Sequence, residues 1–314
     1  MAPMTDPWRE RLEAGRALLV DGGTGSELRW RGYLLRADAW SAPASLTHPE
    51  LLREIHADYI DAGADVITTN TFAATRFVLD AAGLGQRAAE IARRAVAAAR
   101  EARAASGRDV AIAGSISCLP PRFEPRAYPD ARAESAAYRE LAVVLAAEGV
   151  DLIALEMLED REHAARACEA ALATGLPVWL GVSCRLGADG ALVAFDFPET
   201  PLSALLDALL PFAPDAVNVM HSPPDAIAPA LAAVGARWPG VRGAYPELEK
   251  GMTGIAGTRD YGDATTLAPR ELAELARAWL AAGARIVGGC CGATPAHIRA
   301  LRALLDAAEG LTSG

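Results

Sequence analysis

The chain has 314 residues and carries 40 acidic against 30 basic side chains, which gives a formal charge of −10. This balance argues against general binding of nucleic acids or acidic membranes, because both attract basic surfaces. Hydrophobic residues make up 52% of the sequence, which excludes a disordered chain. No apolar run approaches the roughly 18 residues that a transmembrane helix needs.

The N-terminus and the cysteines favour a cytoplasmic protein. Residues 1–11 are polar and charged and lack the apolar stretch of a secretory signal. The five cysteines are few for this length and two of them are adjacent, a pattern unlike a disulfide framework. We therefore expect a reducing, cytoplasmic environment. The sequence leaves the oligomeric state open.

Short apolar runs recur along the chain, each ending in small or polar residues. Runs of this length and composition are typical of buried parallel strands. They predict strands at residues 17–21, 65–70, 109–114, 151–156, 177–183, 215–220, 241–245 and 284–288.

Between these runs lie Ala-, Leu- and Arg-rich stretches with helical periodicity. Pro49 and Pro295 each stand where a first helical residue is expected, and Gly63 stands where the first of these helices should end. A further helix is predicted to end near Gly235. The pattern is therefore one of strands that alternate with helices.

Eight such units in roughly 300 residues favour a (β/α)8 TIM barrel, here as a single α/β domain over residues 1–314. The alternative is a doubly wound sheet, whose first turn usually carries a G-x-G-x-x-G phosphate loop. Residues 21–26 read Asp-Gly-Gly-Thr-Gly-Ser and lack that spacing, so we prefer the barrel. The longest non-helical insertions are predicted at residues 117–130 and 246–266.

In a TIM barrel, function lies at the carboxyl ends of the strands. The predicted ends provide two carboxylates, a histidine and two adjacent cysteines, a combination that packing alone does not need. In chain order the polar residues at these ends include Asp21, Asn70, Thr71, Ser115, Glu156, Ser183, His221, Glu247, Cys290 and Cys291.

Cys290 and Cys291 are the first candidates for chemistry. Neighbouring residues of a strand face opposite ways, so both thiols can reach one ion only if the chain turns there. Gly288, Gly289 and Gly292 supply that freedom. Adjacent thiols in such a turn indicate a soft metal, Zn²⁺ above all. The alternative is two small residues that end a buried strand.

Asp21 and Glu156 are the second candidates, because a buried carboxylate needs a partner and a substrate ammonium group would serve. The backbone amides of Gly22, Gly23 and Thr24 form a turn that can hold a carboxylate. Together these groups describe an amino-acid site. The alternatives are a helix cap at Asp21, a glycosidase-like acid–base pair and a plain tight turn.

These motifs, taken together, resemble the homocysteine S-methyltransferase family. The resemblance is carried by Asp21-Gly-Gly-Thr-Gly-Ser-Glu-Leu, by Ile67-Thr-Thr-Asn-Thr-Phe72, by Glu156 and by Ile286-Val-Gly-Gly-Cys-Cys-Gly-Ala-Thr-Pro295 followed by His297. Members of the family are TIM barrels that use zinc to activate the thiol of homocysteine. The resemblance implies that Cys290 and Cys291 are zinc ligands, that Asp21 and Glu156 hold the substrate amine, that the amides around Gly23 and Thr24 hold its carboxylate, and that Asn70, Thr71 and Phe72 border the pocket.

The sequence departs from the family where the third zinc ligand is expected. The family has a Cys after an Asn at the end of the sixth strand, but residues 217–224 read Val-Asn-Val-Met-His-Ser-Pro-Pro. His221 is the candidate replacement, and the alternative is a loop histidine that bonds locally. Glu247 also stands where the family usually has Asn. The segment after the third strand lacks the family's Gly-Pro-rich pattern.

The resulting hypothesis is a zinc-dependent S-methyltransferase of methionine biosynthesis. Its partners would be small molecules: a thiol acceptor, homocysteine or a close analogue, and a sulfonium or ammonium methyl donor. Aromatic residues make up 6% of the chain, which favours a sulfonium donor such as S-methylmethionine or S-adenosylmethionine over a caged quaternary ammonium. The alternative is a cage formed by aromatic residues near the first two predicted loops: Trp30, Tyr33, Trp40 and Phe72. Two alternatives remain: a divergent barrel that binds an amino acid without metal, and an enzyme that acts on another sulfur compound.

Overall fold

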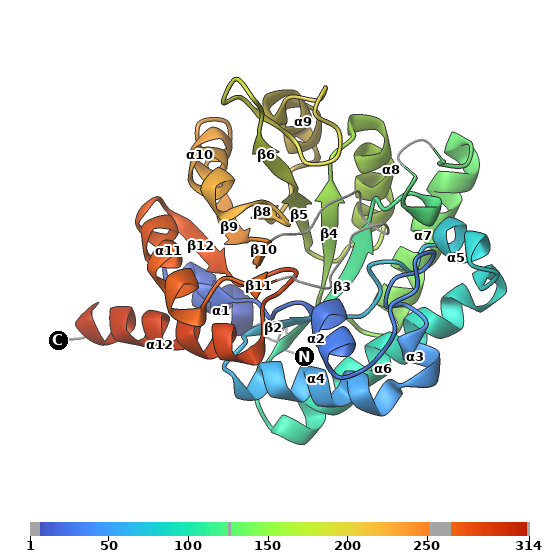
Figure 1. Ribbon diagram of the computed structural model, residues 1–314, viewed down its shortest axis with the longest axis horizontal. Coiled ribbons are helices and arrows are strands. Elements are labelled where there is room, and N and C mark those ends of the chain that lie inside the picture. Colours follow the sequence, from blue (N-terminus) through green and yellow to red (C-terminus); the bar gives the residue numbers. More distant parts are fainter. Residues whose placement is uncertain (1–6, 125–126, 251–264, 313–314) are drawn as a thin grey trace.

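A computed structural model describes residues 7–124, 127–250 and 265–312. Eight parallel strands form one sheet in the order β1-β12-β9-β8-β5-β4-β3-β2 (Figure 1). A parallel bridge between Val20 and Val66 joins the two ends of that order. The amide of Asp21 also donates to the carbonyl of Val66 at 3.0 Å. The sheet therefore closes, and the helices surround it, as the predicted TIM barrel requires.

The barrel strands coincide with the eight predicted runs. Their bounds are β1 Leu18–Leu19, β2 Val66–Thr68, β3 Ala111–Ser117, β4 Leu152–Leu158, β5 Val178–Val182, β8 Ala216–Met220, β9 Val241–Tyr245 and β12 Ala284–Val287. The main difference is that β3 and β4 continue beyond their predicted ends at residues 114 and 156. Glu156 is thus an internal residue of β4 and not its last one.

Two antiparallel hairpins, which the sequence did not predict, stand outside the barrel sheet. One pairs β6 (Cys184–Leu186) with β7 (Leu192–Ala194), and the other pairs β10 (Glu249–Lys250) with β11 (Thr265–Thr266). The second belongs to the predicted insertion at residues 246–266, of which residues 251–264 lie outside the described residues. Their strands have two or three residues each, too short for a clear alternating pattern.

The helices begin and end near the predicted signals, including Pro49, Pro295 and Gly235. Their bounds are α1 Pro7–Glu13, α2 Thr24–Trp30, α3 Ala44–Thr47, α4 Pro49–Asp61, α5 Arg76–Ala81, α6 Ala88–Ser106, α7 Ala131–Ala147, α8 Arg161–Leu172, α9 Leu202–Leu209, α10 Pro224–Gly235, α11 Pro269–Ala281 and α12 Pro295–Thr312. Short 3-10 helices occupy Gly85–Arg87, Pro121–Phe123 and Leu210–Phe212. Within the described ranges, none of the helices is long and apolar enough to span a membrane.

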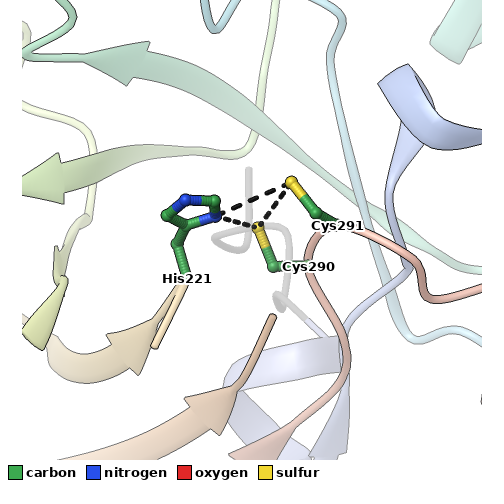
Figure 2. Close-up of side chains that lie close together, drawn as sticks. All are labelled: His221, Cys290 and Cys291. Carbon is green, nitrogen blue, oxygen red and sulfur yellow. Dashed lines mark hydrogen bonds between the residues drawn. The ribbon is translucent and has the colours of Figure 1, made fainter. Parts of the chain in front are cut away.

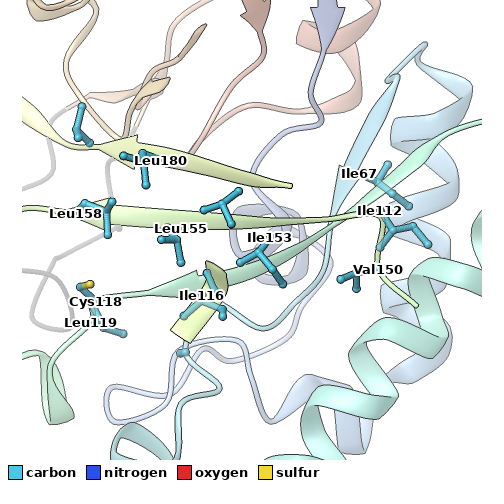
Figure 3. Close-up of a cluster of buried hydrophobic side chains, with 14 of the residues drawn as sticks. Ile67, Ile112, Ile116, Cys118, Leu119, Val150, Ile153, Leu155, Leu158 and Leu180 are labelled. Carbon is cyan, nitrogen blue, oxygen red and sulfur yellow. The ribbon is translucent and has the colours of Figure 1, made fainter. Parts of the chain in front are cut away.

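Alternating side chains of the strands build two separate cores. On β4, for example, Ile153 and Leu155 belong to the large cluster between the sheet and the helices, part of which Figure 3 shows. Leu152 and Ala154 belong instead to a smaller cluster inside the barrel. Trp8 of α1 joins this inner cluster, where α1 closes the amino end of the barrel. The opposite, carboxyl end is therefore left for a site.

Candidate active site

A cavity opens at the carboxyl ends of the barrel strands, where the sequence placed the chemistry. Most of the predicted site residues line it. The cavity is lined by Val20, Asp21, Gly22, Gly23, Thr24, Gly25, Ser26, Trp40, Ser41, Thr68, Thr69, Asn70, Phe72, Leu119, Glu156, Met157, Met220, His221, Tyr245, Gly289, Cys290 and Cys291.

His221, Cys290 and Cys291 come together at one side of this cavity (Figure 2). Nδ1 of His221 lies 3.6 Å from each sulfur, and the two sulfurs lie 4.0 Å apart. With Zn–S bonds of about 2.3 Å and a Zn–N bond of about 2.0–2.1 Å, the edges of a tetrahedron measure about 3.6 Å for S···N and about 3.8 Å for S···S. The three ligand atoms therefore already fit three corners of a tetrahedral zinc site.

The electrostatics of the two thiols also fit a cation. The neighbouring Cys291 and burial both raise the pKa of the Cys290 thiol well above its usual range. Two adjacent thiolates in such a place repel one another unless a positive charge is shared between them. A divalent metal supplies that charge, whereas a purely structural pair would stay protonated.

The turn after β12 brings the two thiols to the same side. Gly292 has a φ of +81°, and the amide of Ala293 donates to the carbonyl of Cys290 at 3.1 Å. A Cβ on Gly292 would lie 2.6 Å from Cγ of Glu249. Both the conformation and the space thus require glycine at this position. The predicted turn at the cysteine pair is confirmed.

Positive backbone angles at two non-glycine residues add further side chains to the cavity. His221 has a φ of +43° and Met157 a φ of +52°. Each follows a residue, Met220 or Glu156, that already lines the cavity, so two consecutive side chains face the same space. Regular strand geometry forbids this, and the pairing of β4 with β5 indeed shifts register between Leu155 and Leu158.

The end of β9 and the residues after it connect the segment of His221 to the segment of Cys290 and Cys291. On one side, His221 N donates to the carbonyl of Tyr245 at 3.3 Å, and Glu247 N donates to the carbonyl of Ser222 at 3.1 Å. On the other side, the bonds are from Cys290 N to Pro246 O at 2.9 Å and from Leu248 N to Cys291 O at 2.8 Å. Backbone bonds to one shared segment therefore set the distance from the histidine to the cysteines.

Asp21 and Glu156 line the same cavity, and each is held by hydroxyl or amide donors. Asp21 accepts from the Thr68 amide at 2.7 Å and from the Thr68 hydroxyl at 3.0 Å. Glu156 accepts from the Ser115 hydroxyl. Burial raises the pKa of Asp21 to about 8 and that of Glu156 to about 7. No Lys or Arg lies among the described residues that line the cavity, so burial dominates both pKa values, and an ammonium group would stabilise the charged forms.

Of the remaining predicted site residues, two line the cavity and one lies behind its wall. Asn70 lines the cavity, but its side chain amide bonds the Ser41 carbonyl at 2.9 Å and the Ser45 hydroxyl at 3.1 Å. Phe72 lines the cavity as expected. Thr71 does not line it: the residue is fully buried, and its hydroxyl donates to the Ser115 carbonyl at 2.6 Å. Thr71 therefore supports the wall from behind.

The amides of residues 22–24 lie at the cavity, but one of them is already used. The Gly23 amide donates to the Ala293 carbonyl at 3.1 Å, so the amides of Gly22 and Thr24 are the more accessible candidates for a substrate carboxylate. Gly22 and Gly23 are needed because neighbouring backbone packs closely against them. A Cβ on Gly22 would lie 2.5 Å from the Ala293 carbonyl oxygen, and one on Gly23 would lie 2.8 Å from the Cys290 carbonyl oxygen.

The sequence indicated only some of the apolar residues of the site. Met157, Met220 and Tyr245 form a small buried cluster against which Phe72 and Cys290 pack. Phe72 and Trp40, which the sequence placed near the first two loops, line the cavity together with Tyr245, so three aromatic side chains surround it. Nothing in the sequence distinguishes Met157, Met220 and Tyr245 as cavity wall from core. Cys184 is fully buried beside Ser222 and stands outside the metal-ligand group.

Comparisons with known proteins agree with this geometry. The profile of the homocysteine S-methyltransferase family matches residues 18–305. Homocysteine S-methyltransferase 4 of Zea mays is 30% identical over 95% of this chain and 92% of its own, and betaine--homocysteine S-methyltransferase 1 of Danio rerio is 30% identical over 96% of this chain and 76% of its own. The metallated homocysteine methyltransferase MmuM of Escherichia coli superposes with a TM-score of 0.77 at 27% identity, over 95% of this chain and 99% of that one. The chain therefore belongs to the homocysteine S-methyltransferase family.

Proposed function

We propose that this S-methyltransferase is a zinc enzyme that transfers a methyl group from a sulfonium donor to the thiol of homocysteine, giving methionine. Family membership supports methyl transfer to homocysteine. The observation that carries the zinc requirement is the arrangement of His221, Cys290 and Cys291, whose ligand atoms match three corners of a tetrahedron. A zinc ion held by these three residues would keep one position open for the acceptor sulfur.

The acceptor is held at both ends of its amino-acid part. Asp21 and Glu156 bind the ammonium group, and the hydroxyls of Thr68 and Ser115 hold the two carboxyls in place. The amides of Gly22 and Thr24 are the donors proposed for the carboxylate. This fixed orientation directs the thiol toward Cys290 and Cys291, so the protein contributes chiefly by positioning.

The chemistry requires loss of the thiol proton and an in-line displacement. Zinc, when bound to His221, Cys290 and Cys291, lowers the pKa of a thiol, as metals do for their ligands. The acceptor sulfur forms the new bond to the methyl carbon, and the bond between that carbon and the donor sulfur breaks. The cluster of Met157, Met220 and Tyr245 excludes water beside the reacting sulfur.

The lining of the cavity supports a cationic donor. Trp40, Phe72 and Tyr245 present aromatic rings, and no Lys or Arg occurs among the described residues that line the cavity. A methylated cation gains from aromatic faces and from the nearby carboxyls. Of the two cation types we propose the sulfonium, S-methylmethionine or S-adenosylmethionine, and betaine is the competitor to test.

The test combines metal content with turnover. We expect about one zinc per chain by plasma mass spectrometry, since the described residues contain one such group of ligand atoms. We also expect methionine formation from homocysteine with a sulfonium donor. Cys290→Ser and His221→Ala should each remove zinc and lower turnover more than about 100-fold. The matched control is Cys168→Ala, because Cys168 is a buried cysteine on α8 outside the site. This variant should keep wild-type zinc content and turnover. A metal-free wild type after reduction and zinc supplementation, or full activity of Cys290→Ser, contradicts the proposal.

A further inference from the structure

Glu247 is a buried carboxylate for which the proposed function, on which this inference rests, has no role. It follows β9 and is 8% exposed. Its Oε2 lies 4.0 Å from Nε2 of His221, within ion-pair distance. Nε2 is the ring nitrogen opposite Nδ1, which lies 3.6 Å from both thiols. Glu247 thus approaches the metal-ligand group from behind the histidine.

The chemistry of the imidazole ring indicates what a carboxylate at this position can do. A ring nitrogen that binds a metal carries no proton, so a neutral His221 with Nδ1 at the thiols holds its proton on Nε2. A buried N–H needs an acceptor. The Glu247 carboxylate is close enough to serve as that acceptor, since shortening the 4.0 Å separation by about 1 Å would give a hydrogen bond.

The backbone sets this pair in place. Glu247 N donates to the carbonyl of Ser222, the residue next to His221, and the Tyr245 carbonyl accepts from His221 N. The ring of Phe195 packs against the His221 ring edge-on, at 5.1 Å between centroids. The imidazole is therefore restrained by a neighbouring ring as well as by a carboxylate on a fixed segment.

We infer that Glu247 is a positioning residue of the metal centre. Its carboxylate keeps the His221 ring oriented with Nδ1 toward Cys290 and Cys291, and it stabilises the ring when a metal withdraws electron density from it. It does not touch the substrate or the metal.

The same carboxylate would also affect the charge beside the centre. Zinc held by two thiolates and a neutral imidazole would carry no net charge, and an ionised Glu247 would add negative charge next to His221. Glu247 would then influence the rate through the electron density of the His221 ring.

Two substitutions separate orientation from charge. Glu247→Gln keeps an acceptor oxygen and removes the charge, whereas Glu247→Met keeps the approximate size and removes both. We expect zinc affinity, measured by competition with a chromophoric chelator, to fall about 10-fold for Glu247→Gln and about 100-fold for Glu247→Met, the range for lost partners of metal-binding histidines. In the Co²⁺-loaded protein, the absorption bands of the thiolates should persist in both variants, and the d–d bands should shift in Glu247→Met.

Glu134→Gln is the matched control, because Glu134 is another buried glutamate, paired with His163 at 2.7 Å away from the site. It should leave zinc affinity and the Co²⁺ spectrum unchanged. If the Glu247 variants bind zinc within threefold of the wild type, with the wild-type Co²⁺ spectrum and turnover, the positioning role is wrong while the proposed function stands. If Glu247→Met fails to fold, Glu247→Gln alone decides by the same criterion. A wild-type protein that binds no zinc contradicts both the positioning role of Glu247 and the proposed function.

Discussion

At the scale of single residues, the cavity is marked by two buried acids whose pKa values are raised by burial. Asp21 is 2% exposed, and its pKa near 8 arises from burial that outweighs two hydrogen bonds from Thr68. Glu156 follows the same principle with a pKa of about 7, and its charge raises the pKa of Asp21 further. The proposed ammonium group would stabilise the charged forms of both carboxyls.

This argument predicts a pH dependence. As the pH falls through 8 and then 7, the free enzyme protonates Asp21 and Glu156, so kcat/KM for homocysteine should fall with them. Asp21→Asn should raise KM for homocysteine about 30-fold or more, since losing one partner of a buried charge pair costs about 2 kcal/mol or more. Initial rates between pH 6 and 9 with S-methylmethionine as donor measure both effects.

The stability of the folded enzyme should increase as the pH falls, whereas kcat/KM should decrease. A folded-state pKa above the unfolded value means that the folded protein binds more protons, so the free energy of unfolding of the ligand-free enzyme declines from about pH 4 to about pH 8 as Asp21 ionises. Asp21→Asn removes part of that decline and should unfold at a higher temperature than the wild type at pH 9. Misfolding cannot produce weaker binding together with higher stability, whereas equal KM values for the two proteins would exclude the ammonium site.

At the scale of elements, the site depends on departures from regular strands. The turn at Gly292, the register shift near Met157 and the positive φ of His221 each bring neighbouring side chains to one space. Gly292 also packs against Glu249, whose Oε1 accepts from the Ser26 hydroxyl at 2.9 Å. That hydroxyl in turn accepts from the Gly292 amide at 2.9 Å. The cysteine turn is thus connected to α2 through Ser26 and to β10 through Glu249.

Gly292→Ala should therefore damage the metal centre. A Cβ there meets Glu249 at 2.6 Å in addition to the strain of its φ of +81°, so we expect zinc affinity at least about 10-fold lower and a loss of about 1–3 kcal/mol in stability. Gly107→Ala is the control, since its φ is +63° and its Cβ would have no neighbour within 4 Å. Chelator competition and thermal unfolding compare the two, and equal zinc affinities would rule out a special role for this turn.

The sequence predicted the strands and the cysteine turn, but it did not predict contacts that depend on how the strands pair. Strand positions and the cysteine turn followed from local patterns, because apolar runs and glycines act over a few residues. The relation of His221 to Glu247 did not follow, since it depends on the pairing of β8 with β9. The wall formed by Met157, Met220 and Tyr245 was equally hidden, because apolar residues in a strand look the same whether they face a core or a cavity.

At the scale of the whole molecule, the barrel separates stability from chemistry. The amino end is closed by α1, whose Trp8 packs edge-on against Trp179 at 5.6 Å between ring centroids. The small inner cluster fills the barrel beneath the cavity. The reactive groups all lie at the carboxyl end, so changes at the two ends should have separable effects.

Trp8→Ala tests this separation. Trp8 is 6% exposed and joins the inner core, so its removal should lower the free energy of unfolding by about 3–5 kcal/mol, as for other large-to-alanine changes in cores. Trp8→Phe keeps an aromatic ring, so its free energy of unfolding should fall by less than that of Trp8→Ala. At temperatures where both variants remain folded, zinc content and KM for homocysteine should equal those of the wild type. A Trp8→Ala protein that is folded by circular dichroism but has lost zinc would show that closure of the amino end determines the geometry of the metal centre, because the inner core would then transmit the change along the length of the barrel.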